Sequence, residues 1–147
     1  MNARKLLAGL SLGLFCHTAQ AGEPIADLDK FEASYIACIE KEFADGCFES
    51  GFEAHQFSGQ KANVGAAKTF LDNWRNGDGI YKVHPIERKS RGGVYQKRYY
   101  LIEREAGSLM LFNVRFRTVK GSWYLVDLQA SNDEEVLREV TFQTPAP

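Results

Sequence analysis

The sequence contains few of the residues that most often carry chemistry. Its 147 residues include three cysteines, three histidines and two methionines. No C-x-x-C or H-x-x-x-H spacing occurs, so the common kinds of zinc site are not indicated. Beyond residue 21, no serine lies in the G-x-S-x-G pattern of a hydrolase nucleophile. These absences favour a non-catalytic protein that needs no metal and no cofactor.

Long hydrophobic runs are also scarce, and the one at the N-terminus has the form of a secretory leader. A basic pair at residues 4–5 precedes an apolar stretch at 6–16, and Ala19-Gln20-Ala21 forms an A-x-A cleavage site. We predict cleavage after Ala21. A membrane anchor would need ~20 apolar residues, about twice this stretch. A lipid anchor at Cys16 is disfavoured because the residues before it do not fit a lipidation signal.

Removal of this leader changes the size and charge of the chain. The mature product has 147 − 21 = 126 residues, which we interpret as a single domain over residues 22–147. Its 18 − 2 = 16 basic residues against 19 acidic ones give a net charge of −3. No basic stripe indicates nucleic acid, and no later run is long enough to span a membrane. The sequence therefore predicts a periplasmic or secreted domain.

Cleavage also changes the meaning of the cysteine count. Cys16 is removed with the leader, and the remaining cysteines, Cys38 and Cys47, form an even pair in an oxidising compartment. We predict a structural disulfide between them, worth roughly 2.7 kcal/mol for a loop of about ten residues. A metal or redox role is the alternative, but His55 is the one further ligand nearby.

The first half of the mature chain shows helical periodicity. Apolar residues recur at steps of three and four from a helix start near residues 27–29, with Asp29 and Glu32 as an expected capping pair. A second short helical or irregular segment covers 47–56, after a turn at Asp45-Gly46, and another helix starts near Asn63. The apolar stripes that carry these predictions are Leu28, Phe31, Tyr35, Ile39 and Phe43, and then Val64, Ala67, Leu71 and Trp74.

From residue 80 the period changes to two. Four strands are predicted, over 80–89, 94–104, 109–118 and 123–130, with turns between them. Helices followed by hairpin-linked strands indicate an α+β fold, with N-terminal helices packed on an antiparallel meander sheet of about four strands. The tail from Ser131 is either a capped helix or a further strand that ends near Phe142.

The turns set the expected register. A turn centred on Ala106-Gly107 places Arg98 opposite Arg115, and a three-residue loop at 120–122 places Arg115 opposite Asp127. A two-residue turn at Lys120-Gly121 would bury polar groups, so we favour the three-residue loop. The predicted apolar face holds Tyr99, Leu101, Met110, Phe112, Val114, Phe116, Val126 and Leu128. The mixed face holds Gln96, Arg98, Tyr100, Asn113, Arg115, Arg117, Trp123, Leu125, Asp127 and Gln129.

The mixed face carries the most informative polar cluster. Two opposed arginines are unfavourable unless an anion or a carboxylate lies between them. A solvated face with an Arg–Asp pair is one interpretation; a dimer or partner surface is another, since Arg, Tyr and Trp are enriched at interfaces, and a small-anion site is the third. The predicted partner or anion surface consists of Arg98, Tyr100, Arg115, Arg117, Trp123 and Asp127.

The order of elements, with the closing segment Gly121-Ser122-Trp123-Tyr124-Leu125-Val126, resembles the cone-shaped domains of the nuclear-transport-factor-two-like or ketosteroid-isomerase-like superfamily. The resemblance implies a curved sheet wrapped around helices, a pocket in the cone and frequent dimerisation through the sheet. It implies no particular reaction, because the superfamily contains enzymes, binders and interaction domains.

Three functional hypotheses follow. The first is an exported, non-catalytic module that binds an envelope protein or a second copy of itself, with an immunity or inhibitor protein as a subtype. The second is a small-ligand binder that uses the cone. The third is an isomerase-like or hydrolase-like enzyme, in which Tyr100 and Asp127 would be the acid/base pair. Neither His55 nor His84 has a visible partner for catalysis, which favours the first hypothesis.

Overall fold

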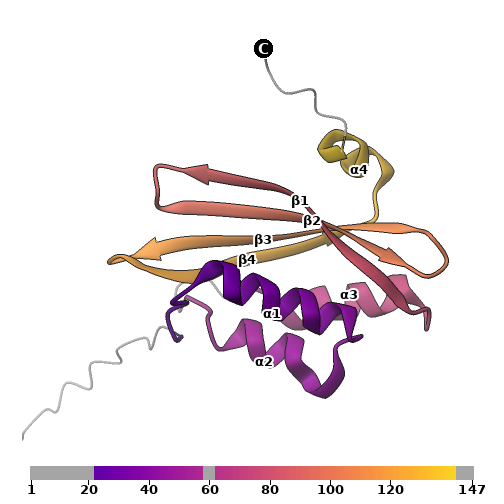
Figure 1. Cartoon of the computed structure of the whole chain (residues 1–147), viewed down its shortest axis with the longest axis horizontal. Helices are drawn as coiled ribbons and strands as arrows, with labels where there is room; N and C mark the ends of the chain where they lie inside the picture. Colours follow the sequence, from indigo (N-terminus) through magenta and orange to yellow (C-terminus); the bar gives the residue numbers. More distant parts are fainter. Residues whose placement is uncertain (1–21, 58–61, 142–147) are drawn as a thin grey trace, which may run out of the picture.

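The computed structural model describes residues 22–57 and 62–141. The predicted leader and its cleavage site, the predicted strand end at Phe142 and the C-terminal prolines lie outside the described residues. Three helices form one layer, and a four-stranded sheet forms the other, while a last short helix lies on the opposite side of the sheet (Figure 1). The predicted α+β class, with N-terminal helices on an antiparallel meander, is confirmed.

The first helix, α1 (Leu28–Glu40), starts one residue after its cap. The side chain of Asp27 accepts hydrogen bonds from the backbone N–H groups of Asp29 and Lys30, which satisfies donors that a helix start leaves without partners. The expected capping pair was therefore wrong: Asp27 is the cap, and Glu32 lies in the protein interior with 5% of its surface exposed. The apolar stripe of α1 faces the sheet, as predicted.

Between α1 and α2 (Cys47–Glu53), the chain reverses through a one-turn 3₁₀ helix, η1 (Ala44–Gly46). Three residues of this reversal that are not glycine, Glu42, Phe43 and Asp45, have left-handed backbones with φ near +60°. Such a conformation costs about 1–2 kcal/mol for a residue with a Cβ atom. Burial of Phe43, which is 5% exposed, and a covalent link between the two helices hold the turn in place.

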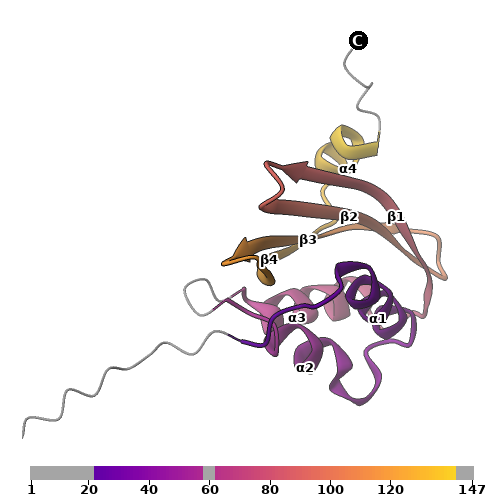
Figure 2. The same ribbon diagram turned by 60° about the vertical axis from the view of Figure 1, so that its left-hand side comes forward.

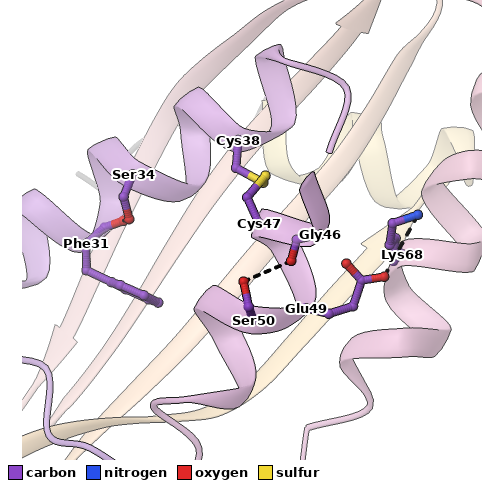
Figure 3. Close-up of a disulfide and its surroundings, with 8 residues drawn as sticks. All are labelled: Phe31, Ser34, Cys38, Gly46, Cys47, Glu49, Ser50 and Lys68. Carbon is purple, nitrogen blue, oxygen red and sulfur yellow. Dashed lines mark hydrogen bonds and ion pairs between the residues drawn. A yellow bond between two sulfur atoms is a disulfide. The ribbon is translucent and has the colours of Figure 1, made fainter. Parts of the chain in front are cut away.

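That link is the predicted disulfide, and it is present. Cys38 and Cys47 are bonded with a Cα–Cα distance of 5.9 Å, within the range that a disulfide requires. Figure 3 shows the bond joining the last turn of α1 to the first turn of α2. Ser50 Oγ donates to the carbonyl oxygen of Gly46 at 2.9 Å in the same turn. The bond thus keeps the two short helices folded back on each other.

The remaining elements follow the sequence periodicity closely. The third helix is capped by Asn63, whose side chain accepts from the Ala66 N–H at 2.9 Å, and the tail forms a helix rather than a strand, capped by Asp133. No described helix is both long and apolar enough to cross a bilayer. The elements are α3 (Val64–Arg75), β1 (Ile80–Arg91), β2 (Tyr95–Arg104), β3 (Leu109–Val119), β4 (Ser122–Ser131) and α4 (Glu134–Thr141).

The strands pair in chain order, β1-β2-β3-β4, all antiparallel. Segments near the N-terminus cover the edge of β4: Ile25 bridges to Trp123, and Gln56 bridges to Leu125. An uncovered strand edge invites pairing with other chains, so these bridges protect one edge of the sheet. The face toward α1, α2 and α3 is called the inner face below, and the face toward α4 is called the outer face (Figure 2).

The first predicted register was wrong by one residue. Tyr100 pairs with Phe112 and Arg98 with Val114, so Arg98 does not face Arg115. The turn between β2 and β3 holds three residues, 105–107, and Gly107 has a φ of +85°. Glycine in this conformation is typical of a three-residue hairpin loop. The shift turns β2 over and places Arg98 and Tyr100 on the inner face, while Tyr99 and Leu101 point outward.

The second predicted register is right along part of its length. Arg115 pairs with Asp127 and Val114 with Leu128, as expected, but Phe116 pairs with Leu125 rather than Val126. The predicted three-residue loop at 120–122 was wrong: the turn holds two residues, Lys120-Gly121, both with positive φ, as in a type I′ hairpin. A β-bulge at Val126 inserts one residue and restores the expected register beyond it.

Because of this bulge, Trp123 and Leu125 lie on the inner side, although the mixed face was predicted for both. Leu125 is fully buried and Trp123 packs against the core. Tyr124, between them, points outward and pairs with Arg117.

Candidate functional site

The structure divides the predicted partner or anion surface between the two faces of the sheet. Arg98 and Tyr100 are buried on the inner face, with exposures of 2% and 0%, and Trp123 also packs inward. Arg115, Arg117 and Asp127 remain on the outer face and are partly exposed. The six residues therefore do not form one surface.

On the inner face, Arg98 is held by carboxylates of α1. Its guanidinium donates to Glu32 Oε2 at 2.6 Å and to the carbonyl oxygen of Leu28 at 3.1 Å, and it lies 2.9 Å from Asp29 Oδ1. Glu32 also pairs with Arg88 of β1. A buried charge is tolerated when it is paired and fully hydrogen-bonded. This cluster therefore joins α1 to two strands and is not a solvent-facing site.

Two tyrosines extend the cluster into the core. Tyr100 donates to Glu32 Oε1 at 2.5 Å, and the hydroxyls of Tyr100 and Tyr35 are hydrogen-bonded to each other. Burial raises the pKa of Tyr100 well above its usual range, and the neighbouring Tyr35 and the Glu32 carboxylate raise it further. Burial likewise raises the pKa of Tyr35, although its hydrogen bond with Tyr100 acts in the opposite direction. Both hydroxyls stay protonated at any physiological pH.

Aromatic rings fill the space around these hydroxyls. The rings pack edge to face or tilted, with centroids about 5–6 Å apart, an arrangement favoured by their quadrupoles. The space between the helices and the sheet that these residues occupy is therefore packed with side chains. The rings are Phe31, Tyr35, Phe48, Phe52, Tyr100, Phe112 and Phe116.

The proposed acid/base pair of Tyr100 and Asp127 does not form. Tyr100 pairs with Phe112, which faces inward, whereas Asp127 pairs with Arg115 on the outer face. The two side chains lie on opposite sides of the sheet. Asp127 is 3.3 Å from the Arg115 guanidinium, the ion pair that the sequence predicted.

On the outer face, basic side chains stand directly opposite one another. Lys89 of β1 pairs with Lys97 of β2, and Lys97 pairs with Arg115 of β3. These three residues, with Asp127 of β4 at the end, form a row across all four strands. Like charges directly opposite each other destabilise a sheet. The opposed cations expected from the sequence therefore exist, but Lys97 takes the place that was assigned to Arg98.

The next row toward the hairpin tips adds two more arginines and three aromatic rings. Arg91 pairs with Tyr95, Tyr95 with Arg117, and Arg117 with Tyr124. The guanidinium of Arg117 lies 5.2 Å from the ring centre of Phe57, within the range of a cation–π contact.

A hollow opens between the two rows. It has a volume of about 280 Å³, and it is lined by Lys89, Arg91, Tyr95, Gln96, Lys97 and Arg115. We call it the basic hollow. Its described lining residues include four cations and no carboxylate.

Few carboxylates neutralise these cations. Lys89 lies 3.1 Å from Glu87, and Arg115 lies 3.3 Å from Asp127. Among the described residues, Lys97 and Arg91 have no carboxylate within 4 Å, although Lys97 lies 4.7 Å from the ring centre of Tyr99. An anion in the hollow would relieve repulsion that the chain itself leaves in place. The basic hollow is therefore the candidate binding site.

Other groups that could carry chemistry have structural partners. His84 is hydrogen-bonded to Glu103 at 2.8 Å, and His55 to the carbonyl oxygen of Glu23 at 2.8 Å; neither partner was apparent in the sequence. No cluster of three or more metal-binding side chains occurs in the part of the chain that the structure describes. A second hollow, of about 250 Å³, lies beside the disulfide and is lined by residues of α1 and of the turn after it.

Comparison with known proteins finds no protein family whose model matches the chain and no curated protein that matches it in sequence. Two solved structures resemble it. A DUF4783 family protein from Bacteroides ovatus aligns over 67% of this chain and 91% of its own, with a TM-score of 0.46 and 9% identity. Bd1075 of Bdellovibrio bacteriovorus aligns over 71% of this chain and 39% of its own, with a TM-score of 0.45 and 14% identity.

Proposed function

We propose that the protein is an exported, non-catalytic interaction module that binds another protein chain through the outer face of its sheet. The N-terminal leader pattern and the disulfide between Cys38 and Cys47 support a periplasmic or secreted location, since such bonds persist in oxidising compartments. An immunity or inhibitor protein is the subtype that fits a small, disulfide-linked domain of this kind.

The observation that carries the proposal is the row of opposed cations on the outer face. Lys89, Lys97 and Arg115 occupy neighbouring strands, about 4.8 Å apart. Tyrosine rings flank the row, and Arg and Tyr are the residue types enriched in protein interfaces. A partner that supplies carboxylates would replace repulsion with attraction at this face.

The resemblance to the nuclear-transport-factor-two-like superfamily supports the same face. The resemblance implies frequent dimerisation through the sheet, and the helices α1, α2 and α3 cover the other face of the sheet (Figure 2). We include membership of this superfamily in the proposal.

The alternative is a small-ligand binder or enzyme that uses a pocket in the cone. It receives less support, because aromatic rings occupy the inner face and Glu32, Arg98 and Tyr100 are hydrogen-bonded to one another. A ligand would have to break these bonds in order to reach the carboxylate.

A photo-crosslinking amino acid tests the proposal. Placed at Val94, which is 52% exposed on the β1–β2 hairpin next to the basic hollow, it should give crosslinked adducts in cells, and Lys97→Glu in the same chain should abolish them. The matched position is Phe70, 40% exposed on α3 in the helical layer, where no adduct is expected. Equal adducts from both positions, or adducts insensitive to Lys97→Glu, would contradict the proposal.

A further inference from the structure

We propose that the partner presents an extended segment with acidic residues two positions apart, and that this segment pairs with the free edge of β1 as a fifth strand of the sheet. The inference rests on the proposed function, because it names the form and the chemistry of the partner at the same surface. Three features support it: an unpaired strand edge, backbone groups that point away from the sheet, and a pair of cations beside them.

The two edges of the sheet differ in what covers them. Ile25 and Gln56 bridge to β4, whereas no described segment other than β2 bridges to β1. The first part of β1 lies beside the end of α1, where the Val83 N–H donates to Glu40 Oε1 at 3.1 Å. Residues 85–91 of β1 are all exposed, and we call them the open edge. In both views the end of β1 at the β1–β2 turn lies apart from the helices (Figures 1 and 2).

The hydrogen bonds of β2 show which way the backbone of β1 points. The carbonyl oxygen of Val94, just before β2, accepts from the Thr118 N–H of β3 at 2.9 Å. Residues of an antiparallel strand direct their backbone groups alternately to one neighbour and to the other. Since β2 and β3 pair without a register shift, the even-numbered residues of β2 bond to β3 and the odd-numbered ones to β1.

Two residues of the open edge therefore have free backbone groups. Lys89 and Arg91 pair with odd-numbered residues of β2, so their own N–H and C=O groups bond to β2. Arg88 and Ser90 pair with even-numbered residues, and their N–H and C=O groups point away from the sheet. Pro85 also pairs with an even-numbered residue, so its missing N–H removes no ladder bond. The open edge thus offers the hydrogen-bonding groups that an added strand uses.

The side chains beside these groups select an acidic strand. Lys89 and Arg91 lie two residues apart on the outer face and line the basic hollow together with Lys97 and Arg115. Successive side chains of a strand alternate between faces, so the residues of an added strand that face these two cations are also two apart. Glu87, next on the same face, is 3.1 Å from Lys89. Two acidic residues therefore suit this edge, and a third one opposite Glu87 does not.

The same cations act against a second copy of β1 as the added strand. Lysine and proline on an edge strand are typical means of preventing identical chains from pairing. Between two copies, Lys89 and Arg91 would meet further cations, whereas an acidic strand replaces this repulsion with attraction.

Two synthetic peptides of one composition test the register. The first, acetyl-Thr-Thr-Glu-Thr-Glu-Thr-Thr-amide, places both glutamates on the same side of a strand. Its isomer, acetyl-Thr-Thr-Glu-Glu-Thr-Thr-Thr-amide, places them on opposite sides. Each is titrated into the mature chain, residues 22–147, and its Kd is measured from the amide signals in NMR spectra. The first peptide should bind about fivefold more tightly, because only it presents two carboxylates to the hollow.

N-methylation of the peptide separates strand pairing from charge attraction. In an antiparallel ladder, the pairing that all four strands already use, the central threonine lies opposite Ser90 and its N–H faces β1. N-methylation there should abolish binding. N-methylation of the first glutamate, whose N–H faces away from β1, is the matched control and should leave the Kd as it is.

Amide hydrogen exchange locates the added strand on the protein. In the free protein, the N–H groups of Arg88 and Ser90 should exchange rapidly, whereas that of Lys89, bonded to β2, should be protected. Saturation with the first peptide should slow exchange at Arg88 and Ser90. Unchanged exchange at both residues in the saturated protein contradicts pairing at this edge.

Variants of the protein test the same contact from the other side. Ser90→Pro removes an N–H from the open edge and none from the ladder, so the chain should keep its stability in urea and lose the peptide. Lys89→Glu should weaken binding about tenfold, and a peptide with lysine in place of the second glutamate should restore it. Lys30→Glu, an exposed reversal on α1, should leave the Kd unchanged.

The outcomes distinguish this inference from the proposed function. Equal binding of the two isomers, or binding that survives N-methylation of the central threonine, overturns the inference. Lys97-dependent crosslinks from Val94 that persist in Ser90→Pro cells also overturn it, and the proposed function then stands with a partner that adds no strand. A wild-type chain without such crosslinks rejects the proposed function, and the peptide titrations then decide the inference by themselves.

Discussion

Lys97 and Arg98 are neighbours in the chain and both are cations, yet the sheet places them in opposite surroundings. Arg98 points inward, is 2% exposed and contacts the carboxylates of Glu32 and Asp29. Lys97 points outward between two other cations and has no carboxylate within 4 Å among the described residues. The inner charge is compensated within the chain, whereas the outer one is not. Whether a charged residue has a structural role or is available for binding therefore depends on the groups around it on its face of the sheet, and not on its residue type.

The largest expected effect comes from breaking the inner cluster. Glu32→Gln removes the carboxylate that contacts Arg98, Arg88 and Tyr100, and leaves a buried guanidinium with less compensation. We expect the free energy of unfolding in urea to fall by about 3–5 kcal/mol.

The matched change on the outer face is Asp127→Asn, which removes the partner of Arg115. That ion pair is about one-third exposed on both sides, so its loss should change stability by about 1 kcal/mol or less. Similar losses in the two variants would mean that the faces do not differ as described.

The next effect concerns the helices that cover the inner face. Replacing both cysteines, as Cys38→Ala/Cys47→Ala, should lower the free energy of unfolding by about 2.7 kcal/mol, because the unfolded chain gains freedom. Urea unfolding with and without a reductant measures it, and the variant should match the reduced wild type. Unchanged stability would show that burial of Phe43 alone maintains the turn between α1 and α2.

Alkaline pH should weaken the inner face selectively. The pKa values of Tyr35 and Tyr100 are raised in the folded protein, so above pH ~10 the unfolded chain loses these protons while the folded chain keeps them. The contribution of the two tyrosines to the free energy of unfolding is therefore fully present below pH ~10. Above that pH it falls by about 1.4 kcal/mol per pH unit for each tyrosine.

Urea unfolding between pH 9 and pH 11 measures this slope. Tyr35→Phe should reduce it, whereas Tyr81→Phe, at a side chain that is 68% exposed, should leave it as in the wild type. An identical slope in all three proteins would contradict the assignment of the tyrosines.

The smallest effect is expected on the outer face. Lys97→Gln removes one of three opposed cations and should raise the free energy of unfolding by about 0.2–1 kcal/mol. Lys30→Gln on α1 is the comparison, with no opposed cation across a strand. A loss of more than about 1 kcal/mol for Lys97→Gln would show that Lys97 has a structural role like that of Arg98.

The sequence predicted the elements well because their signals are local. The apolar stripe from Leu28 to Ile39, the change of period at Ile80 and the glycines in the turns were sufficient for the α+β class and the four-stranded meander. The cysteine pair was also predictable, since Cys38 and Cys47 are close in the chain.

The faces of the sheet were harder to predict, because one residue in a turn decides them. On β2, both alternating sets contain tyrosine, a cation and an aliphatic residue, so composition does not choose between Tyr99 and Tyr100. Gly107, at the third position of the turn, was the available signal. The bulge at Val126 had no signal in the sequence, because a bulge inside an apolar run does not alter the pattern of apolar and polar residues.

The sequence also carried a signal for the inner cluster, at Glu32. Glu32 lies four residues after Leu28, in phase with the apolar stripe of α1, and was interpreted as part of a cap. A carboxylate at a core position predicts a buried cation on the facing sheet, which Arg98 supplies. The outer row of cations also follows from the sequence once β2 is placed in its observed register.

The opposed locations of the helical layer and the cation row have a kinetic consequence. Residues 22–56 contain nine acidic and two basic residues, a net charge of −7, whereas residues 80–120 contain ten basic and three acidic ones, a net charge of +7. The first two helices therefore carry an excess of negative charge and the strands β1 to β3 an excess of positive charge, although residues 133–139 add a net charge of −3 on the outer side of the sheet. The field of these charges would turn an approaching charged molecule before contact, so association at the sheet should be fast in dilute buffer and slow markedly with ionic strength.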